Sequence, residues 1–275
     1  MTHRPAWAPN DVDIERPSPA RIYDYFLGGS HNFAADRQLA EEYMRVLPDM
    51  PVISRANRAF LRRAVSVLVA EAGIDQFLDL GSGLPSRGNV HEAAQAVDPN
   101  ARVVYVDSDP VTVAYAKAML EDVPNADILH ADLRDPGAIL ESDEVAGQLD
   151  LTRPIGVLMV AVLHFVAPED DPAGIVAGYR EVSAPGSYLV LSHATNEYHP
   201  DTAREAESVY SRASSGMNFR SRARIAELLE DYELLPPGLT DVIDWRPDPP
   251  VDDCGDPLGG DVTRYNLLAA VGRRA

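Results

Sequence analysis

The chain has 275 residues and is 45% hydrophobic, which is enough for one large domain with a substantial core. Its 43 Asp and Glu residues outweigh 24 Lys and Arg residues, and the net charge of -19 disfavours nucleic acid as a partner because it would repel phosphates. The start of the sequence lacks the apolar stretch of a secretion signal, and the longest apolar run is too short to span a bilayer. With a single cysteine, the composition predicts a cytoplasmic protein that binds no membrane.

The amino-terminal quarter of the sequence predicts a tail followed by helices. Residues 1–17 are rich in Pro and charge, and we expect a mobile tail there. Next, Ser18 can cap a helix that begins with Pro19 and ends at Gly28 or Gly29. Residues 33–48 and 51–73 predict two more helices, so residues 18–73 should form a helical cap.

From residue 74 to the end, the pattern predicts an α/β core. Apolar runs at 77–80, 102–107, 126–132, 154–165 and 186–195 indicate strands, with helical spacing at 89–97 and 109–123. This alternation is typical of βαβ units, and continuous apolar strands indicate a parallel sheet covered on both faces.

The last part of the core is predicted from three further runs. Residues 220–235 have helical spacing, and residues 239–245 and 264–272 could add a hairpin to the sheet. The stretch between these two strands, 246–263, is acidic and rich in Pro and Gly. We expect a surface loop there, and a candidate lid.

The candidate binding site lies where the first three strands end, because ligands of doubly wound sheets bind at the carboxyl ends of strands. Gly81 and Gly83 follow the first strand and would let a ligand approach the main chain. Asp107 ends the second strand, where a carboxylate can accept hydrogen bonds from both ribose hydroxyls. Asp132 ends the third and could hold the amino group of an adenine.

Two cofactors fit these residues. A nicotinamide dinucleotide requires G-x-G-x-x-G, but the sequence has Ser86 at the position of the third glycine. S-adenosylmethionine has no pyrophosphate, and Asp79, just before the glycines, could orient its ammonium group. The acidic residue therefore favours the sulfonium cofactor.

Several long motifs resemble one known family. "PSPARIYDYFLGGSHNFAADR", "ANRAFLRRAV", "QFLDLGSGLPSRGNVHEAAQ", "VVYVDSDPVTVAYA", "ADLRDP", "VAVLHFV" and "GSYLVLSHAT" closely resemble the S-adenosyl methyltransferase family, formerly a family of unknown function. The resemblance covers about residues 17–272. It implies a class I methyltransferase fold: a doubly wound, mostly parallel, seven-stranded Rossmann-like sheet that binds S-adenosylmethionine and releases S-adenosylhomocysteine.

The resemblance also implies roles for individual residues. Asp107 would hold the ribose, Asp132 and Leu133 the adenine, and the main chain from Gly81 to Gly83 would lie along the methionine moiety. The complete set of predicted cofactor-binding residues is Tyr23, Asp79, Gly81, Ser82, Gly83, Asp107, Ser108, Asp132 and Leu133.

Other residues have candidate roles that leave alternatives open. His164, in "VLHFV", is the predicted catalytic residue, since a pKa near neutrality suits a general base, although a packed histidine is the alternative. His193 is a weaker candidate for the same role. Arg55, Arg58 and Arg62 share one helix face, and one of them could pair with the methionine carboxylate.

Two surface features complete the prediction. Tyr23, Tyr25, Phe26 and Phe33, with the Gly28-Gly29 pair, could form a hinged aromatic cover or could simply pack the cap. The carboxylates of 246–263 lack histidine partners, so we predict no metal site.

We therefore predict a methyltransferase acting on a small molecule by in-line transfer. A nicotinamide-dependent oxidoreductase and a non-catalytic S-adenosylmethionine sensor are the alternatives. The sequence predicts neither the acceptor nor the oligomeric state.

Overall fold

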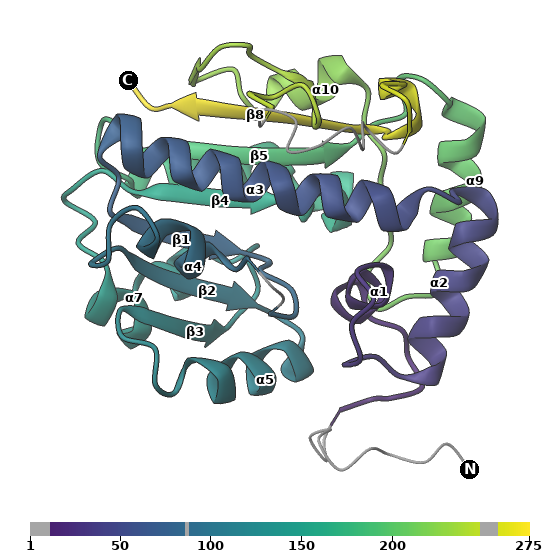
Figure 1. Cartoon of the computed structure of the whole chain (residues 1–275), viewed down its shortest axis with the longest axis horizontal. Coiled ribbons are helices and arrows are strands. Elements are labelled where there is room, and N and C mark those ends of the chain that lie inside the picture. Colours follow the sequence, from purple (N-terminus) through teal and green to yellow (C-terminus); the bar gives the residue numbers. More distant parts are fainter. Residues whose placement is uncertain (1–11, 86–87, 248–257) are drawn as a thin grey trace.

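A central β-sheet organises the protein (Figure 1), whose computed structural model describes residues 12–85, 88–247 and 258–275. The strand order is β3-β2-β1-β4-β5-β8-β6, and β7 also pairs with β8. Strands β1 to β5 are parallel, and β8 runs antiparallel to its neighbours. The strands are β1 (Gln76–Leu80), β2 (Arg102–Asp107), β3 (Ala126–His130), β4 (Gly156–Val160), β5 (Tyr188–Ala194), β6 (Glu233–Leu234), β7 (Thr240–Asp241) and β8 (Leu267–Arg273).

Helices cover both faces of this sheet, as the continuous apolar strands predict. One hydrophobic cluster joins the sheet to α3 (Met50–Ala72), α4 (Val90–Gln95) and α5 (Pro110–Leu120). A second cluster on the other face includes residues of α6 (Pro136–Leu140), α7 (Asp143–Gln148), α8 (Pro172–Val182) and α10 (Arg222–Glu227). All five residues of β1 are buried. The order reverses at β1, between β2 and β4, so the crevice of a doubly wound fold opens at the carboxyl end of β1.

A group of helices stands beside the carboxyl ends of the parallel strands (Figure 1). It contains α1 (Pro19–Phe26), α2 (Ala34–Val46) and the amino-terminal part of α3, all from the predicted cap. It also contains α9 (Pro200–Tyr210), which follows β5 and packs on α2. The Tyr43 and Tyr210 rings meet edge to face at 4.9 Å, and Glu42 pairs with Arg212. The cap is therefore completed by a distant segment that the sequence analysis did not identify.

Residues 12–17, which the sequence assigned to a mobile tail, instead pack against the protein. Val12 is buried with Phe33, Leu84 and Val111. The carbonyl of Pro17 accepts a hydrogen bond from the Ser214 amide at 2.8 Å. Residues 1–11 of the predicted tail lie outside the described residues.

The carboxyl-terminal part of the sheet differs from the prediction of seven strands. Helix α10 ends at Glu227, well before residue 235, and residues 233–234 form β6. Only Thr240–Asp241 of the predicted strand 239–245 pairs with β8, as β7. Pro236 and Pro237 separate β6 from β7 and have no amide hydrogen to donate, so two short strands occupy this edge and the sheet has eight.

The structure also bears on the predicted fourth strand and on the candidate lid. The fourth strand ends at Val160, because Ala161 has a positive φ of 57° and the 3₁₀ turn η1 (Leu163–Phe165) follows. Most of the candidate lid, residues 248–257, lies outside the described residues, and the 3₁₀ turn η3 (Val262–Arg264) follows it. The other 3₁₀ turn of the described residues is η2 (Pro168–Asp170).

Candidate cofactor and acceptor site

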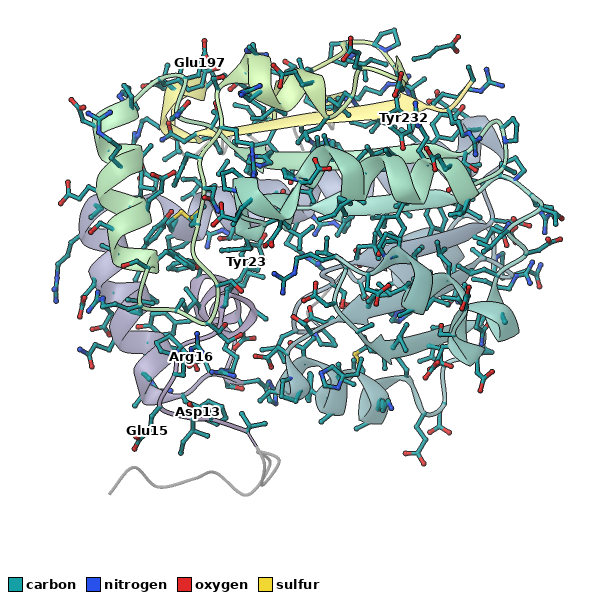
Figure 2. The ribbon with its side chains drawn as sticks, turned by 180° about the vertical axis from the view of Figure 1, so that it is seen from behind. Asp13, Glu15, Arg16, Tyr23, Glu197 and Tyr232 are labelled. Carbon is teal, nitrogen blue, oxygen red and sulfur yellow. The ribbon has the colours of Figure 1, made fainter. Side chains whose placement is uncertain are left out.

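A cavity of about 480 Å³, called here the main cavity, opens at the carboxyl ends of β1, β2, β3 and β4. Residues of α1 and the segment before it form its opposite wall, and Figure 2 shows Tyr23 between this helix and the sheet. All nine residues predicted to bind the cofactor line this cavity: Tyr23, Asp79, Gly81, Ser82, Gly83, Asp107, Ser108, Asp132 and Leu133. The structure thus brings together residues from α1 and from the loops after three strands.

The two glycines of the turn after β1 are required for different reasons. Both have left-handed backbones, with φ of 70° at Gly81 and 66° at Gly83. A Cβ at Gly81 would lie 2.2 Å from a methyl carbon of Val162, so this glycine permits close packing against the loop after β4. A Cβ at Gly83 would meet no described atom within 4 Å. Gly83 therefore leaves its main chain open to the cavity.

Asp107 is held by the main chain at the tip of β2. One carboxylate oxygen accepts the Gly83 amide at 2.7 Å, and the other accepts the Asp109 amide at 2.8 Å. Burial raises the pKa of Asp107 to about 6, although these two hydrogen bonds favour the charged form. Each oxygen has a second lone pair, so this fixed carboxylate can accept two further hydrogen bonds.

Asp79 and Arg58 form the charged end of the cavity. Asp79 is 4% exposed, and burial raises its pKa to about 7; the Arg58 guanidinium lowers it and Asp107 raises it further. The Arg58 Nη2 donates to the Gly88 carbonyl at 3.1 Å, but its Nε is buried without a hydrogen-bond partner among the described residues. A ligand with both an ammonium and a carboxylate group would satisfy these two residues.

The end of the cavity near β3 is more exposed. Asp132 pairs with Arg134 at 2.6 Å, which lowers the pKa of this carboxylate, and Arg134 also pairs with Asp170 at 2.9 Å. The neighbouring Leu133 adds an apolar wall, and its carbonyl accepts the Tyr179 hydroxyl at 2.9 Å. These contacts make a slot with an apolar side and a carboxylate rim.

Arg21 connects the cap to the rim of the main cavity, and the sequence analysis missed it. Its guanidinium pairs with Asp36 and with Asp109, both at 2.9 Å, and all three side chains are at least nine-tenths buried. It also donates to the carbonyls of Arg16 at 2.6 Å and Asp13 at 3.5 Å. The sequence did contain a signal for Arg21, because a charged residue on the apolar, aromatic face of a helix is buried only with a partner.

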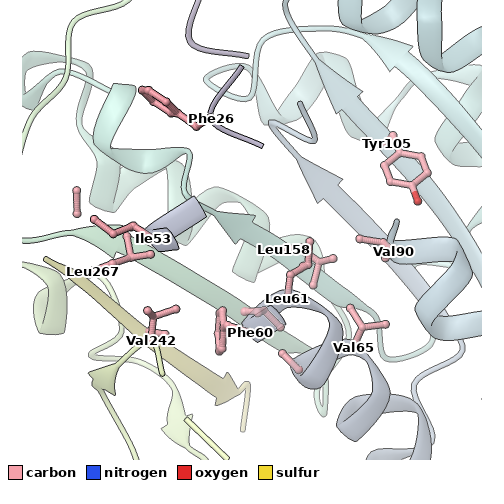
Figure 3. Close-up of a cluster of buried hydrophobic side chains, with 14 of the residues drawn as sticks. Phe26, Ile53, Phe60, Leu61, Val65, Val90, Tyr105, Leu158, Val242 and Leu267 are labelled. Carbon is pink, nitrogen blue, oxygen red and sulfur yellow. The ribbon is translucent and has the colours of Figure 1, made fainter. Parts of the chain in front are cut away.

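A smaller hollow of about 60 Å³, called here the inner hollow, lies beside the main cavity. Four residues line both spaces: Tyr23, Asn57, Ala161 and Phe165. Figure 3 shows three other residues of its lining, Phe26 of α1, Ile53 of α3 and Leu267 of β8. The inner hollow is therefore enclosed by the cap and by the ends of the sheet.

A chain of hydrogen bonds fixes the boundary between these spaces. The Asn57 amide donates to the Tyr23 hydroxyl at 3.0 Å, and this hydroxyl donates to the Ser54 carbonyl at 3.0 Å. The Asn57 oxygen accepts the Ser192 hydroxyl at 2.6 Å, and the Ser192 oxygen accepts the Ala161 amide at 2.9 Å. Burial raises the pKa of Tyr23, so its phenol stays protonated at neutral pH.

His164 lies in η1 and lines the inner hollow, but it is not among the described residues that line the main cavity. Its Nδ1 accepts the Ala194 amide at 3.4 Å. Burial, with His193 and Arg220 nearby, holds the pKa of His164 well below its usual range. The ring is neutral at pH 7, and the proton resides on Nε2.

His193 has a structural position. Its Nδ1 donates to the Ala194 carbonyl and its Nε2 accepts from Arg220, both at 2.7 Å. Burial lowers its pKa to about 3. Both ring nitrogens are thus used within the protein, and Arg220 also holds the carbonyls of Leu163 and Val166 at 2.8 Å.

The three arginines of α3 have different surroundings, and the turn after α1 is fixed. Of the three arginines, Arg58 lines the main cavity and Arg55 is exposed. The Arg62 side chain lies against Gly88. The Gly28-Gly29 turn is fixed by the Asp24 carboxylate, which accepts the His31 amide at 3.0 Å. A fixed turn and buried rings favour packing of the cap over a hinged cover.

Within residues 12–85, 88–247 and 258–275, no helix combines the length and hydropathy needed to cross a bilayer. No group of three or more His, Cys, Asp or Glu side chains in the same ranges is arranged to hold a metal ion.

The strand order is that of the class I methyltransferase fold, and the predicted glycines and aspartates lie at three neighbouring strand ends. The fold also matches that of the N-methyltransferase NodS from Bradyrhizobium japonicum WM9, solved in complex with S-adenosyl-L-homocysteine. That match has a TM-score of 0.50 and 14% identity over 92% of this chain and 98% of that one.

The chain belongs to the S-adenosyl methyltransferase family, whose model matches residues 5–275. It is similar to a provisionally named methyltransferase from Thermobifida fusca YX, with 38% identity, a TM-score of 0.90, and coverage of 98% of this chain and 99% of that one. A DUF574 family protein from Streptomyces avermitilis MA-4680 also has 38% identity and a TM-score of 0.90, with coverage of 96% and 99%. None of the curated proteins compared with the chain matches it. The protein is an S-adenosylmethionine-dependent methyltransferase.

Proposed function

We propose that the protein transfers a methyl group from S-adenosylmethionine, in line, to a small-molecule acceptor in the cytoplasm. The observation that carries this proposal is the shared wall of Tyr23, Asn57, Ala161 and Phe165 between the main cavity and the inner hollow. A donor in one space and an acceptor in the other would meet at this wall.

The polar groups of the main cavity fit the cofactor. Asp107 would accept hydrogen bonds from the ribose hydroxyls, and Asp132 and Leu133 would bind the adenine. Asp79 would pair with the ammonium group of the methionine moiety, and the free Nε of Arg58 would hold its carboxylate. The main chain of Gly81, Ser82 and Gly83, with Ser108 and Tyr23, would enclose the rest.

The protein's contribution to the reaction is alignment and exclusion of water. S-adenosylmethionine supplies a methyl group that is already activated by its positive sulfur. The acceptor's lone pair would bond to the methyl carbon, and the electron pair of the carbon–sulfur bond would stay on sulfur. The acceptor's proton would be released to bulk solvent after the transfer. Holding the acceptor in line by the inner hollow can contribute about 7–11 kcal/mol.

His164 would contact the acceptor in this arrangement. Because its pKa is low and its Nδ1 already accepts the Ala194 amide, the ring is suited to donate a hydrogen bond from Nε2. We assign it this orienting contact and not removal of a proton.

Calorimetry with S-adenosylhomocysteine and with NADH tests the cofactor assignment. We expect micromolar binding of S-adenosylhomocysteine, no binding of NADH, and a loss of affinity of at least tenfold in Asp107→Ala. Binding of NADH alone would overturn the proposal. Release of S-adenosylhomocysteine with a panel of small molecules then tests transfer, and failure to turn over any of them, with turnover of a macromolecule, would refute the acceptor class.

A further inference from the structure

The inner hollow differs from the main cavity in that it has no charged wall. Its described lining contains no Asp, Glu, Lys or Arg. The four lining residues with shifted pKa values are neutral at pH 7. Burial raises the pKa values of Tyr23, Tyr43 and Tyr210 and lowers that of His164. A charged acceptor would find no counter-charge in this lining, and burying an unpaired charge is unfavourable.

Aromatic and sulfur-containing side chains dominate this lining. Tyr43 and Tyr210 meet edge to face at 4.9 Å, and Phe165 lies 5.6 Å from Tyr210. The Tyr43 hydroxyl donates to the Met217 sulfur at 3.3 Å, so the rings are held in place. Flat rings pack well against such walls, by offset and edge contacts and by sulfur contacts.

Two polar atoms in the lining have no hydrogen-bond partner among the described residues. They are the Ser54 hydroxyl on α3 and the Asn266 side-chain oxygen just before β8, on residues that are 1% and 7% exposed. Asn266 also has a left-handed backbone, with φ of 47°. An unpartnered buried polar atom is costly, so such atoms in a cavity wall point to a ligand.

The volume limits the size of that ligand. A cavity of about 150 Å³ is known to bind benzene, so a hollow of about 60 Å³ admits part of one ring and no nucleotide. The rest of the acceptor would extend past the shared wall into the main cavity. Ser54 adjoins the wall shared with the main cavity, since its carbonyl accepts the Tyr23 hydroxyl. Asn266 and Leu267 belong to the β8 side of the hollow.

We infer that the methyl acceptor is an uncharged, monocyclic aromatic or heteroaromatic molecule with two hydrogen-bonding groups. This inference rests on the proposed function. One polar group of the acceptor bonds to the Ser54 hydroxyl on α3, and the other bonds to the Asn266 side-chain oxygen just before β8. The acceptor ring lies among the tyrosine and phenylalanine rings.

Binding to the protein saturated with S-adenosylhomocysteine tests this inference. The probes are 4-hydroxybenzamide, which has the required features, 4-hydroxybenzoate, which differs by a negative charge, and trans-4-hydroxycyclohexanecarboxamide, which is not flat. We expect 4-hydroxybenzamide to bind at least tenfold more tightly than either of the others, measured by ligand-observed NMR titration. Equal or tighter binding of the charged or non-planar probe would overturn the inference.

Two substitutions test whether binding of 4-hydroxybenzamide depends on the Ser54 hydroxyl and the Asn266 side-chain oxygen. Ser54→Ala removes only the hydroxyl, and Asn266→Gly removes the amide while tolerating the left-handed backbone. Each should weaken 4-hydroxybenzamide by about 5- to 10-fold, the effect of one neutral hydrogen bond, and leave S-adenosylhomocysteine affinity unchanged. Ser54→Ala should also raise the melting temperature of the unliganded protein, because it removes an unsatisfied buried group. Unchanged probe affinity in both variants would refute the assignment.

The two proposals fail in distinguishable ways. If S-adenosylhomocysteine does not bind, the proposed function is wrong. If it binds and 4-hydroxybenzamide does not, only the acceptor class is wrong.

Discussion

Replacing Asp79 by Asn should stabilise the unliganded protein while removing cofactor affinity. Burial raises the pKa of Asp79 from 3.8 to about 7. Between these values the folded protein keeps a proton that the unfolded chain has lost, so the stability contributed by this residue falls as pH rises from about 4 to about 7. The shift of about three pKa units corresponds to about 4 kcal/mol, all of which is lost above pH 7. The substituted amide does not ionise and avoids this cost.

Urea unfolding at two pH values measures the effect. The free energy of unfolding of Asp79→Asn should exceed that of the wild type by about 2 kcal/mol at pH 5.5 and by about 4 kcal/mol at pH 8. Asp122→Asn, at an exposed position after α5, is the matched control and should change stability little at either pH. The buried histidines have lowered pKa values, which make stability rise with pH. Both variants keep these histidines, so comparing the two variants cancels the histidine contribution and leaves that of Asp79.

Cofactor binding should depend on pH in the opposite direction to the stability contributed by Asp79. In the proposed site the ammonium group of the methionine moiety would pair with ionised Asp79, so wild-type affinity for S-adenosylhomocysteine should fall as pH decreases below about 7. Asp79→Asn should lose at least tenfold in affinity at pH 8. A variant that is no more stable than the wild type at pH 8, or a stability difference that is the same at both pH values, would refute the reasoning.

Three further predictions concern the cap, the inner hollow and the glycine turn. Arg21→Met should lower the free energy of unfolding by about 3–5 kcal/mol in urea titrations, because it leaves two carboxylates buried without their partner; a loss below 1 kcal/mol would contradict this. His164→Gln should leave S-adenosylhomocysteine affinity within twofold in calorimetry but lower the rate at which methyl transfer produces S-adenosylhomocysteine, because His164 lines the inner hollow and not the main cavity. An equal loss of affinity and rate would place His164 in the cofactor site. Gly83→Ala should cost about 1–2 kcal/mol in thermal or urea unfolding because of its backbone alone. Gly81→Ala should cost more, because it adds a clash with Val162; equal costs would exclude that clash.

The convergence of the predicted glycines and aspartates on one cavity could be predicted because these residues have fixed positions relative to strands. Gly81 and Gly83 follow a continuous apolar strand, and Asp107 and Asp132 follow the next two, so their order along the chain determined that they meet at one edge. The same continuous runs determined that both faces of the sheet are covered by helices. The resemblance of the motifs to the S-adenosyl methyltransferase family is confirmed by the family model.

Most of the proposed acceptor site could not be predicted, although His164 was named from the sequence, because its residues follow no local pattern. Ser54, His164 and Asn266 come from a helix, a 3₁₀ turn and the residue before the last strand, and they converge only when the cap packs on the sheet. The contact of α9 with α2 and the partners of Arg21 depend on the same packing. Periodicity records which face of an element is buried, but not which distant element covers it. The sequence by itself therefore determined the sheet and the group of glycines and aspartates at its edge. Tertiary packing decided the inner hollow, the place of His164 in its wall and the two polar atoms without partners.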